Sequence, residues 1–164
     1  MKALLLTGGL GAGKTAVATE IGERLTGPSA VIDLDWLCWV TGPEVTPLLT
    51  ANLRAVAANY AAAGVTRLVM ARGLLQESHL LAVRQALPGY ELTVVRLDVS
   101  PATALRRIGG RDSGATLEGH LGEVEEFHRK VAAAALEDFV VSNDGRPLAQ
   151  VADEVLLKAA QFVQ

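Results

Sequence analysis

The residues best suited to do chemistry are eight near the start of the chain. They read Gly8-Gly9-Leu10-Gly11-Ala12-Gly13-Lys14-Thr15 and match the pattern G-x-x-x-x-G-K-[ST], with an apolar run before them and a helical pattern after them. Glycines let the backbone turn its N–H groups toward one anion, and the start of the following helix adds a positive partial charge. Lys14 is placed to reach the β- and γ-phosphates, and the Thr15 hydroxyl to bind Mg²⁺. The segment therefore predicts binding of a nucleoside triphosphate with Mg²⁺.

Two carboxylates follow the second apolar run of the chain. Asp33 and Asp35 come directly after Ala30-Val31-Ile32, which we interpret as a strand. Because ligands of parallel sheets bind outside the carboxyl ends of the strands, both side chains are expected at the ligand edge. We assign Asp33 to the metal and Asp35 to the acceptor, whose hydroxyl proton a carboxylate can accept or orient. The alternative is that one of them only caps the helix that follows.

An arginine follows the third apolar run. Arg72 comes directly after Leu68-Val69-Met70-Ala71. A guanidinium at this edge can hold an anionic or hydroxylated group through two hydrogen bonds, so we expect Arg72 to bind the acceptor. The alternative is a structural ion pair with Asp33 or Asp35.

Three further arginines lie in a polar segment that contains several glycines. Arg106, Arg107 and Arg111 precede a long helix expected over about 117–136. Few apolar residues, hinge glycines and cations are typical of a lid that closes over phosphates, and we place this lid at about 109–117. We assign Arg111 to the phosphates, as a catalytic residue, and Arg107 to the nucleotide. The alternative is a solvated basic loop.

The two tryptophans of the chain lie just beyond the carboxylates. Trp36 and Trp39 predict a flat apolar wall for the acceptor, within an acceptor-binding region of about 34–63. The alternative is core packing, which we expect for one of the two. The three histidines, His79, His120 and His128, have no metal-ligand spacing with the single cysteine, and we interpret them as surface residues.

These residues need a sheet to bring them together, and the pattern of the chain supplies one. Short apolar runs alternate with helical patterns; the runs are 3–7, 30–32, 68–71, 92–97 and 139–141. This alternation predicts an α/β fold in three layers, with a parallel sheet covered by helices on both faces. We interpret residues 1–164 as one domain.

Composition excludes several classes of function. A formal net charge of −3 argues against nucleic acid as a partner, and a single cysteine fits a reducing compartment. No apolar run reaches the length of a membrane span, and the first apolar run follows Met1 almost at once, so we expect no signal peptide. The expectation is a cytoplasmic protein, monomer or homodimer, with a small-molecule partner.

The chain resembles the small P-loop kinases that act on shikimate, gluconate, adenylylsulfate and adenylate. The likeness lies in Gly8 to Thr15, in Asp33-Leu34-Asp35, and in Val95 to Pro101 running into Leu105-Arg106-Arg107. It extends to Arg129, which precedes the last strand as an acceptor-binding arginine does in shikimate kinases, and to Asn143-Asp144-Gly145, which is similar to their adenine-side loop.

The resemblance implies a fold, a donor and some of the site residues. It implies the P-loop NTPase fold, a five-stranded sheet of order 2-3-1-4-5, Mg-ATP as donor and a short lid that closes. It also implies that Arg129 binds the acceptor and that Asp144 and Gly145 lie beside the nucleotide. Ala71-Arg72-Gly73 stands where shikimate kinases have three glycines, and the lid arginines are spaced differently.

The sequence thus predicts an ATP-dependent phosphotransferase. It would move the γ-phosphoryl group onto a hydroxyl or phosphate of a small acceptor, with Lys14, Asp35 and Arg111 as catalytic residues. Two alternatives are a nucleoside or nucleotide kinase, in which the tryptophans stack on a base, and a non-catalytic regulatory protein that binds ATP.

Overall fold

Five parallel strands form one sheet in the order β2-β3-β1-β4-β5. The computed structural model describes the backbone of residues 1–42, 44–111 and 114–163, and their side chains except those of 111–121. The strands are β1 (Lys2–Gly8), β2 (Ser29–Asp33), β3 (Arg67–Ala71), β4 (Glu91–Asp98) and β5 (Phe139–Ser142). The order implied by the resemblance is confirmed, and β1 lies at the centre of the sheet.

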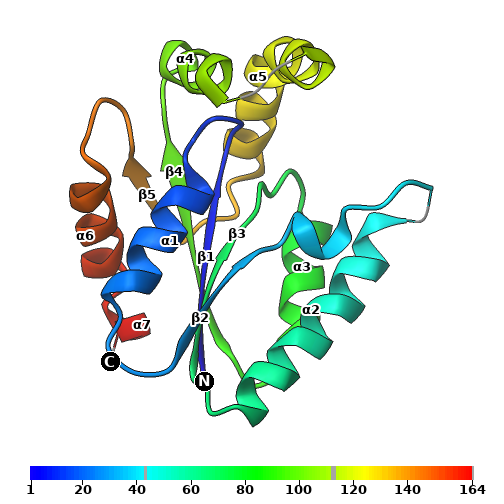
Figure 1. The fold of residues 1–164 in the computed structure, drawn as a ribbon, viewed down its shortest axis with the longest axis vertical. Coiled ribbons are helices and arrows are strands. Elements are labelled where there is room, and N and C mark those ends of the chain that lie inside the picture. The colour runs from blue at the N-terminus through cyan, green and yellow to red at the C-terminus, as the bar shows by residue number, and fades with distance from the viewer. Residues whose placement is uncertain (43, 112–113, 164) are drawn as a thin grey trace.

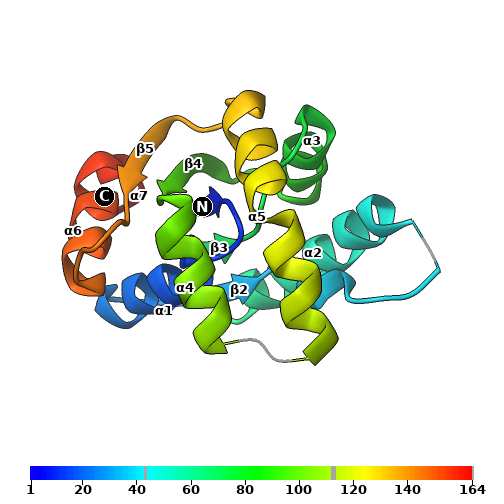
Figure 2. The ribbon, with the colours of Figure 1, turned by 90° about the horizontal axis from the view of Figure 1, so that it is seen from above.

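Helices cover both faces of this sheet, as Figure 1 shows. One layer contains α1 (Lys14–Arg24), α6 (Leu148–Lys158) and α7 (Ala160–Val163); the other contains α2 (Val45–Ala62) and α3 (Glu77–Ala86). A single turn, η1 (Trp36–Cys38), connects β2 to α2. Two more helices, α4 (Pro101–Arg111) and α5 (Gly114–Ala134), rise beyond the carboxyl edge of the sheet and lie across it when seen from above (Figure 2).

The alternation of side chains along β1 explains why the core has two halves. Leu4 and Leu6 point into the layer that contains α1 and α6, whereas Ala3 and Leu5 point into the layer that contains α2 and α3. All four side chains are fully buried. A buried leucine contributes about 1.5–3 kcal/mol, so this strand is a rigid base for the loop that follows it.

The predicted lid is the tip of a helical hairpin. Helix α4 continues through Gly109 and Gly110 to Arg111, and α5 starts at Gly114 rather than near 117. Two internal glycines cost about 1 kcal/mol each, but Ala104 and Ile108 are fully buried and hold α4 against the core. Residues 112–113 of the predicted lid lie outside the described residues. Closure of the hairpin over a nucleotide stays a prediction.

In the part of the chain that the structure describes, no helix combines the length and the apolar character needed to cross a membrane.

Candidate active site

The phosphate loop connects β1 to α1 at the carboxyl edge of the sheet. Gly13, directly before α1, has a left-handed backbone (φ 84°), and a Cβ there would lie 2.8 Å from Nδ2 of Asn143. The Asn143 side-chain amide donates to the Ala12 carbonyl at 2.7 Å and so holds the phosphate loop against the residue that directly follows β5. The geometry needs glycine at this position and aims the start of α1 at the loop, which is the arrangement of an anion cradle.

The lysine of the loop folds back over the loop itself. Lys14 Nζ donates to the carbonyls of Gly8 at 3.1 Å and Gly9 at 2.9 Å. The Lys14 ammonium group is therefore held at the edge of the phosphate loop, close to the position that a bound phosphate group would occupy.

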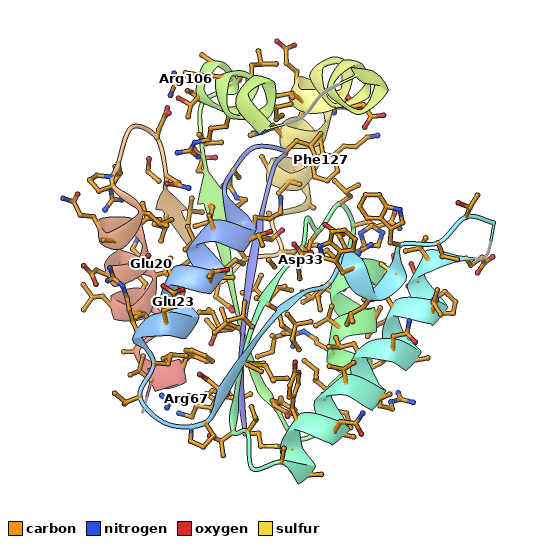
Figure 3. The ribbon with its side chains drawn as sticks, viewed as in Figure 1. Glu20, Glu23, Asp33, Arg67, Arg106 and Phe127 are labelled. Carbon is orange, nitrogen blue, oxygen red and sulfur yellow. The ribbon has the colours of Figure 1, made fainter. Side chains whose placement is uncertain are left out.

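The two predicted metal ligands are in contact. Thr15 Oγ1 donates to Oδ2 of Asp33 at 2.8 Å, while the other carboxylate oxygen of Asp33 accepts from the Asp35 amide at 3.0 Å. A hydroxyl and a carboxylate are hard oxygen donors of the kind that Mg²⁺ prefers. The pair therefore fits a magnesium ion bound beside the phosphate loop. Figure 3 shows Asp33 at the carboxyl edge, while Arg67 lies at the opposite edge.

Asp35 and Arg72 form an ion pair. Arg72 Nη1 lies 2.8 Å from Oδ1 of Asp35, so the structure shows the alternative that the sequence left open for this arginine. The same nitrogen lies 3.0 Å from Cys38 Sγ and 3.5 Å from the Leu34 carbonyl. The Arg72 side chain is 14% exposed and that of Asp35 is 57% exposed. A mostly buried guanidinium thus holds a carboxylate that solvent, or an acceptor, can reach.

Two further features of this ion pair concern the pKa of Asp35 and the hydrogen bonds of Arg72. Desolvation by the surrounding chain raises the pKa of the Asp35 carboxyl above its ordinary value; Arg72 and Lys14 oppose this effect, and Asp33 adds to it. A carboxylate with a raised pKa is a stronger base at neutral pH.

Arg72 Nε is buried with no hydrogen-bond partner among the described residues, and leaving such a donor unpaired costs about 1–3 kcal/mol. Binding of the acceptor by Arg72 stays a prediction.

Both tryptophans lie on the surface. Trp36 is 71% exposed and Trp39 is 76% exposed, so the expectation that one of them packs in the core is wrong. Leu34 and Cys38 occupy the buried positions of this connection instead. The two indoles stack on each other, with ring centroids 5.1 Å apart and planes inclined by 19°. They form a flat apolar surface next to Asp35 in the chain.

Arg107 lies between the phosphate loop and the loop after β5. Its guanidinium donates to the carbonyls of Gly11 at 3.3 Å and Asn143 at 2.8 Å. It borders a cavity of about 210 Å³, whose lining also includes Gly13, Ala16, Asn143, Arg146 and Leu148. The cavity opens beside the start of α1, next to the phosphate loop.

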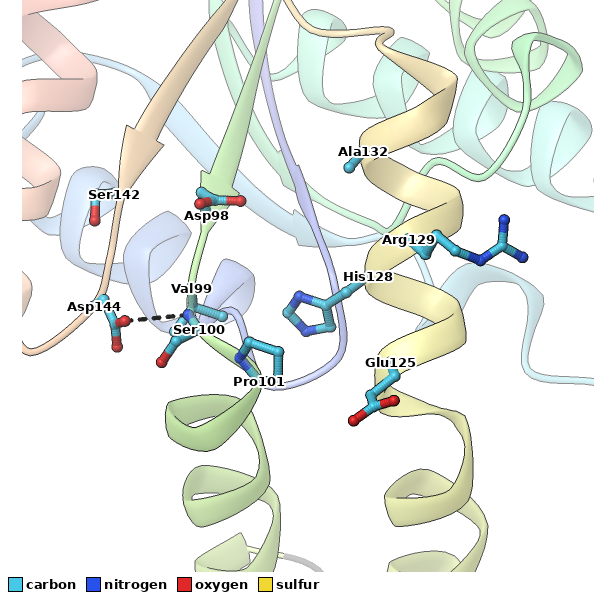
Figure 4. Close-up of a pocket in the computed structure, with 10 residues that line it drawn as sticks. All are labelled: Asp98, Val99, Ser100, Pro101, Glu125, His128, Arg129, Ala132, Ser142 and Asp144. Atoms are coloured by element: carbon cyan, nitrogen blue, oxygen red, sulfur yellow. Dashed lines mark hydrogen bonds between the residues drawn. The ribbon is translucent and has the colours of Figure 1, made fainter.

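Other predicted residues lie elsewhere. The Asp144 carboxylate accepts from the Ser100 amide at 3.2 Å, and Arg129 pairs with Glu126 at 2.6 Å. Both border a second cavity, of about 590 Å³, between the start of α4 and the second half of α5. Figure 4 shows the Arg129 guanidinium pointing away from the His128 ring. The structure does not bring Arg129 against Asp35, and the roles of Arg129, Asp144 and Gly145 stay predictions. The Arg111 side chain lies outside the described residues.

Two residues of α5 that the sequence analysis missed contact the site. His128 Nε2 donates to the Leu10 carbonyl at 2.7 Å, and its ring lies so close to Gly9 that a Cβ there would meet it at 2.3 Å. The ring of Phe127 packs on Gly73 after β3, where a Cβ would meet it at 2.8 Å. The expectation that His128 is a surface residue is therefore wrong. Helical spacing contained the signal, because His128 follows Val124 by four residues and precedes Val131 by three, and both valines are buried.

The sheet order, the glycine-rich loop after β1 and the carboxylate after β2 together define the fold of the small P-loop kinases. Helices α4 and α5 lie beyond the same edge of the sheet.

Solved structures of such kinases are similar over nearly the whole chain. Shikimate kinase from Bacteroides thetaiotaomicron matches with a TM-score of 0.69 and 19% identity, covering 97% of this chain and 98% of that one. A gluconokinase from Sinorhizobium meliloti 1021 matches with a TM-score of 0.67, 21% identity and coverage of 99% and 93%. The APS kinase of Mycobacterium tuberculosis, in complex with AMPPNP and APS, matches with a TM-score of 0.67, 20% identity and coverage of 97% of each chain. No protein-family model and no curated protein sequence matches the chain.

Proposed function

We propose that this protein is a small-molecule kinase that transfers the γ-phosphoryl group of Mg-ATP to a hydroxyl group of a small acceptor. The observation that carries the proposal is the placement of two contacts at one edge of the sheet. Thr15 meets Asp33 beside the phosphate loop, and Asp35, two residues further along, is held by Arg72. The structural neighbours, which are kinases of gluconate, shikimate and adenylylsulfate, support the same reaction class.

The donor half of the site would be built from the loop and its neighbours. The amides from Gly8 to Thr15 and the Lys14 ammonium would bind the phosphates, and Thr15 with Asp33 would hold Mg²⁺. Bound Mg²⁺ would neutralise charge on the phosphate oxygens and favour departure of ADP. Arg107, beside the 210 Å³ cavity, would contact the base, and Arg111 would reach the phosphates when the hairpin closes.

The acceptor half centres on Asp35. Its carboxylate accepts the proton of the acceptor hydroxyl while that oxygen bonds to the γ-phosphorus and the bond to the bridging oxygen of ADP breaks. Arg72 keeps the carboxylate oriented for this step. The raised pKa of Asp35 suits it to accept the proton at neutral pH.

The Asp35→Asn variant tests this function. It keeps the shape of the side chain and a group that can contact Arg72, but it cannot accept the proton. Acceptor-dependent ADP release should fall about 10²- to 10⁴-fold, while the calorimetric affinity for Mg-ATP stays unchanged. Full turnover in this variant would remove Asp35 from the mechanism. ATP hydrolysis that no candidate acceptor stimulates would instead support a regulatory ATP-binding protein.

A nucleoside kinase is a second candidate, and the exposed tryptophan pair favours it. A nucleobase could stack on the outer face of either indole while a ribose hydroxyl meets Asp35. A panel of nucleosides and nucleoside monophosphates, assayed by ADP release, tests this candidate, which fails if none stimulates release.

A further inference from the structure

Three consecutive carbonyl groups of the phosphate loop each accept a hydrogen bond from a side chain of another element. The pairs are His128 with Leu10 at 2.7 Å, Arg107 with Gly11 at 3.3 Å, and Asn143 with Ala12 at 2.7 Å. His128 lies on α5, Arg107 on α4, and Asn143 directly after β5. The loop is therefore held from outside by residues that lie far away in the sequence.

Two of these contacts hold peptide groups that precede a glycine. The Leu10 carbonyl belongs to the peptide group before Gly11, and that glycine has a left-handed backbone (φ 72°). The Ala12 carbonyl belongs to the peptide group before Gly13, which is also left-handed (φ 84°). Because glycine tolerates negative φ as readily, either peptide group could rotate at little cost if nothing held its carbonyl. The histidine and the asparagine hold these two carbonyls.

The direction of each carbonyl sets the direction of the next amide. In a trans peptide group the C=O and N–H bonds point in opposite directions. The Gly11 amide therefore points away from His128, and the Gly13 amide points away from Asn143. Among the described residues, these two amides donate to no other group. Unpaired amides in a loop that leads into a helix are suited to bind an anion.

The His128 ring is positioned by α5 and by a glycine of the loop. A Cβ on Gly9 would lie 2.3 Å from the ring, so glycine at this position makes room for it. Val124 and Val131 lie on the same face of α5 as His128 and are buried, so they anchor this face of the helix. Since a carbonyl oxygen can only accept, Nε2 of His128 carries the proton that the Leu10 carbonyl receives.

We propose that His128 is a positioning residue for the triphosphate. It holds the Leu10 carbonyl and so presents the Gly11 amide to a phosphate group of the donor. Asn143 acts in the same way on the Gly13 amide. This inference rests on the proposed binding of Mg-ATP at the phosphate loop and adds a residue of α5 to that site. His128 does not touch the phosphates and acts only through the peptide group that it holds.

Two substitutions isolate the hydrogen bond of His128 from its packing. His128→Gln and His128→Met place unbranched side chains of the same length on α5, but only glutamine carries an N–H group. Calorimetry with Mg-ATP and with Mg-tripolyphosphate measures the affinity of each variant. Ala133→Ser, at an exposed position of α5, is the control. Thermal unfolding without ligand shows whether each variant is folded.

We expect His128→Met to bind both ligands about three- to tenfold more weakly than the wild-type protein. The factor should be the same for each ligand, because the held amide meets a phosphate group and not the base. His128→Gln should recover most of the affinity, and Ala133→Ser should bind like the wild type. Equal affinities of the glutamine and methionine variants, or a loss for Mg-ATP alone, would overturn the inference.

Nuclear magnetic resonance of protein with isotope-labelled glycine tests the two amides separately and does not depend on the affinities. In the wild type, tripolyphosphate should move the amide protons of Gly11 and Gly13 downfield, because each donates to an anion. In His128→Met the shift of Gly11 should shrink, whereas that of Gly13, which depends on Asn143, should persist. A Gly11 amide that does not respond in the wild type, or that responds equally in the glutamine and methionine variants, would contradict the role of His128.

The kinase function is measured separately, as release of ADP stimulated by an acceptor. If the affinities follow the expected pattern but no acceptor stimulates release, the positioning role stands and the kinase function fails. If an acceptor stimulates release but the glutamine and methionine variants bind Mg-ATP equally well, only the positioning role fails. If the wild type binds no Mg-nucleotide, both fail.

Discussion

The Thr15 hydroxyl donates to the Asp33 carboxylate at 2.8 Å, so two side-chain oxygens from different elements meet beside the phosphate loop. Thr15 lies in the first turn of α1 and Asp33 ends β2. In the proposed function, these two side chains hold Mg²⁺ beside the β- and γ-phosphates of the nucleotide.

Asp33→Asn should therefore weaken metal-dependent binding of ATP. The amide keeps a hydrogen bond to Thr15 but loses the charge, and we expect about a ten- to hundredfold loss of affinity for Mg-ATP. Titration calorimetry with and without EDTA checks this, because binding of metal-free ATP serves as the internal control. An unchanged ratio between the two affinities would contradict a metal role for Asp33.

The acid side of the pH–rate profile should report Asp35. Turnover needs the ionised carboxylate, so kcat should fall as the pH drops through a pKa that desolvation holds above the ordinary value of an aspartate. Arg72→Ala removes the positive charge that opposes this shift, so the pKa should rise further and the acid limb should move to higher pH. Arg84→Ala, at an exposed arginine of α3, serves as the control. A limb that stays in place in Arg72→Ala would show that another group titrates.

A double-mutant cycle should reveal the contact between α5 and the phosphate loop. Gly9→Ala places a Cβ 2.3 Å from the His128 ring, and we expect a loss of about 1–3 kcal/mol in the free energy of unfolding and weaker binding of ATP. His128→Ala removes the obstacle, so the double variant should recover part of the loss, with a coupling energy of about 0.5–3 kcal/mol. Chemical denaturation measures both effects. If the changes in the free energy of unfolding from the two single variants simply add up in the double variant, the His128 ring does not support the phosphate loop.

The cavity beside Arg107 should bind the nucleoside part of the donor. Arg107→Ala removes a cation from its wall, and a cation over an aromatic ring contributes about 0.5–2 kcal/mol. The affinity for ATP should fall more than the affinity for inorganic tripolyphosphate, which has no base. Equal losses for the two ligands would place Arg107 on the phosphates instead.

Much of the fold could be predicted because its signals are local. Apolar runs alternating with helical patterns indicated a parallel α/β sheet, and the strand order came from the resemblance to P-loop kinases. The helical hairpin was misjudged because Gly109 and Gly110 suggested a break. Burial of Ala104 and Ile108 outweighs that local preference, and such packing depends on residues far away in the sequence.

The sequence predicted the position of a candidate site residue where that position depends only on where a strand ends. Asp33 and Asp35 reach the carboxyl edge of the sheet because β2 ends there, and Arg72 reaches it because β3 ends beside β2. Which partner each side chain selects depends on tertiary contacts, so the sequence left the ion pair of Arg72 open and expected a buried tryptophan. Helical spacing indicates that His128 faces inward, but it does not indicate the partner of His128. Its contact with Leu10 joins residues 118 positions apart, and local patterns do not specify such a pair.

Binding of Mg-ATP to the phosphate loop is the claim on which all the other roles depend, and titration calorimetry measures it directly. The account predicts saturable binding at one site, a higher thermal unfolding temperature in excess Mg-ATP, and a large loss of both in Lys14→Ala. No heat and no thermal shift with any Mg-nucleotide up to millimolar concentration would contradict it.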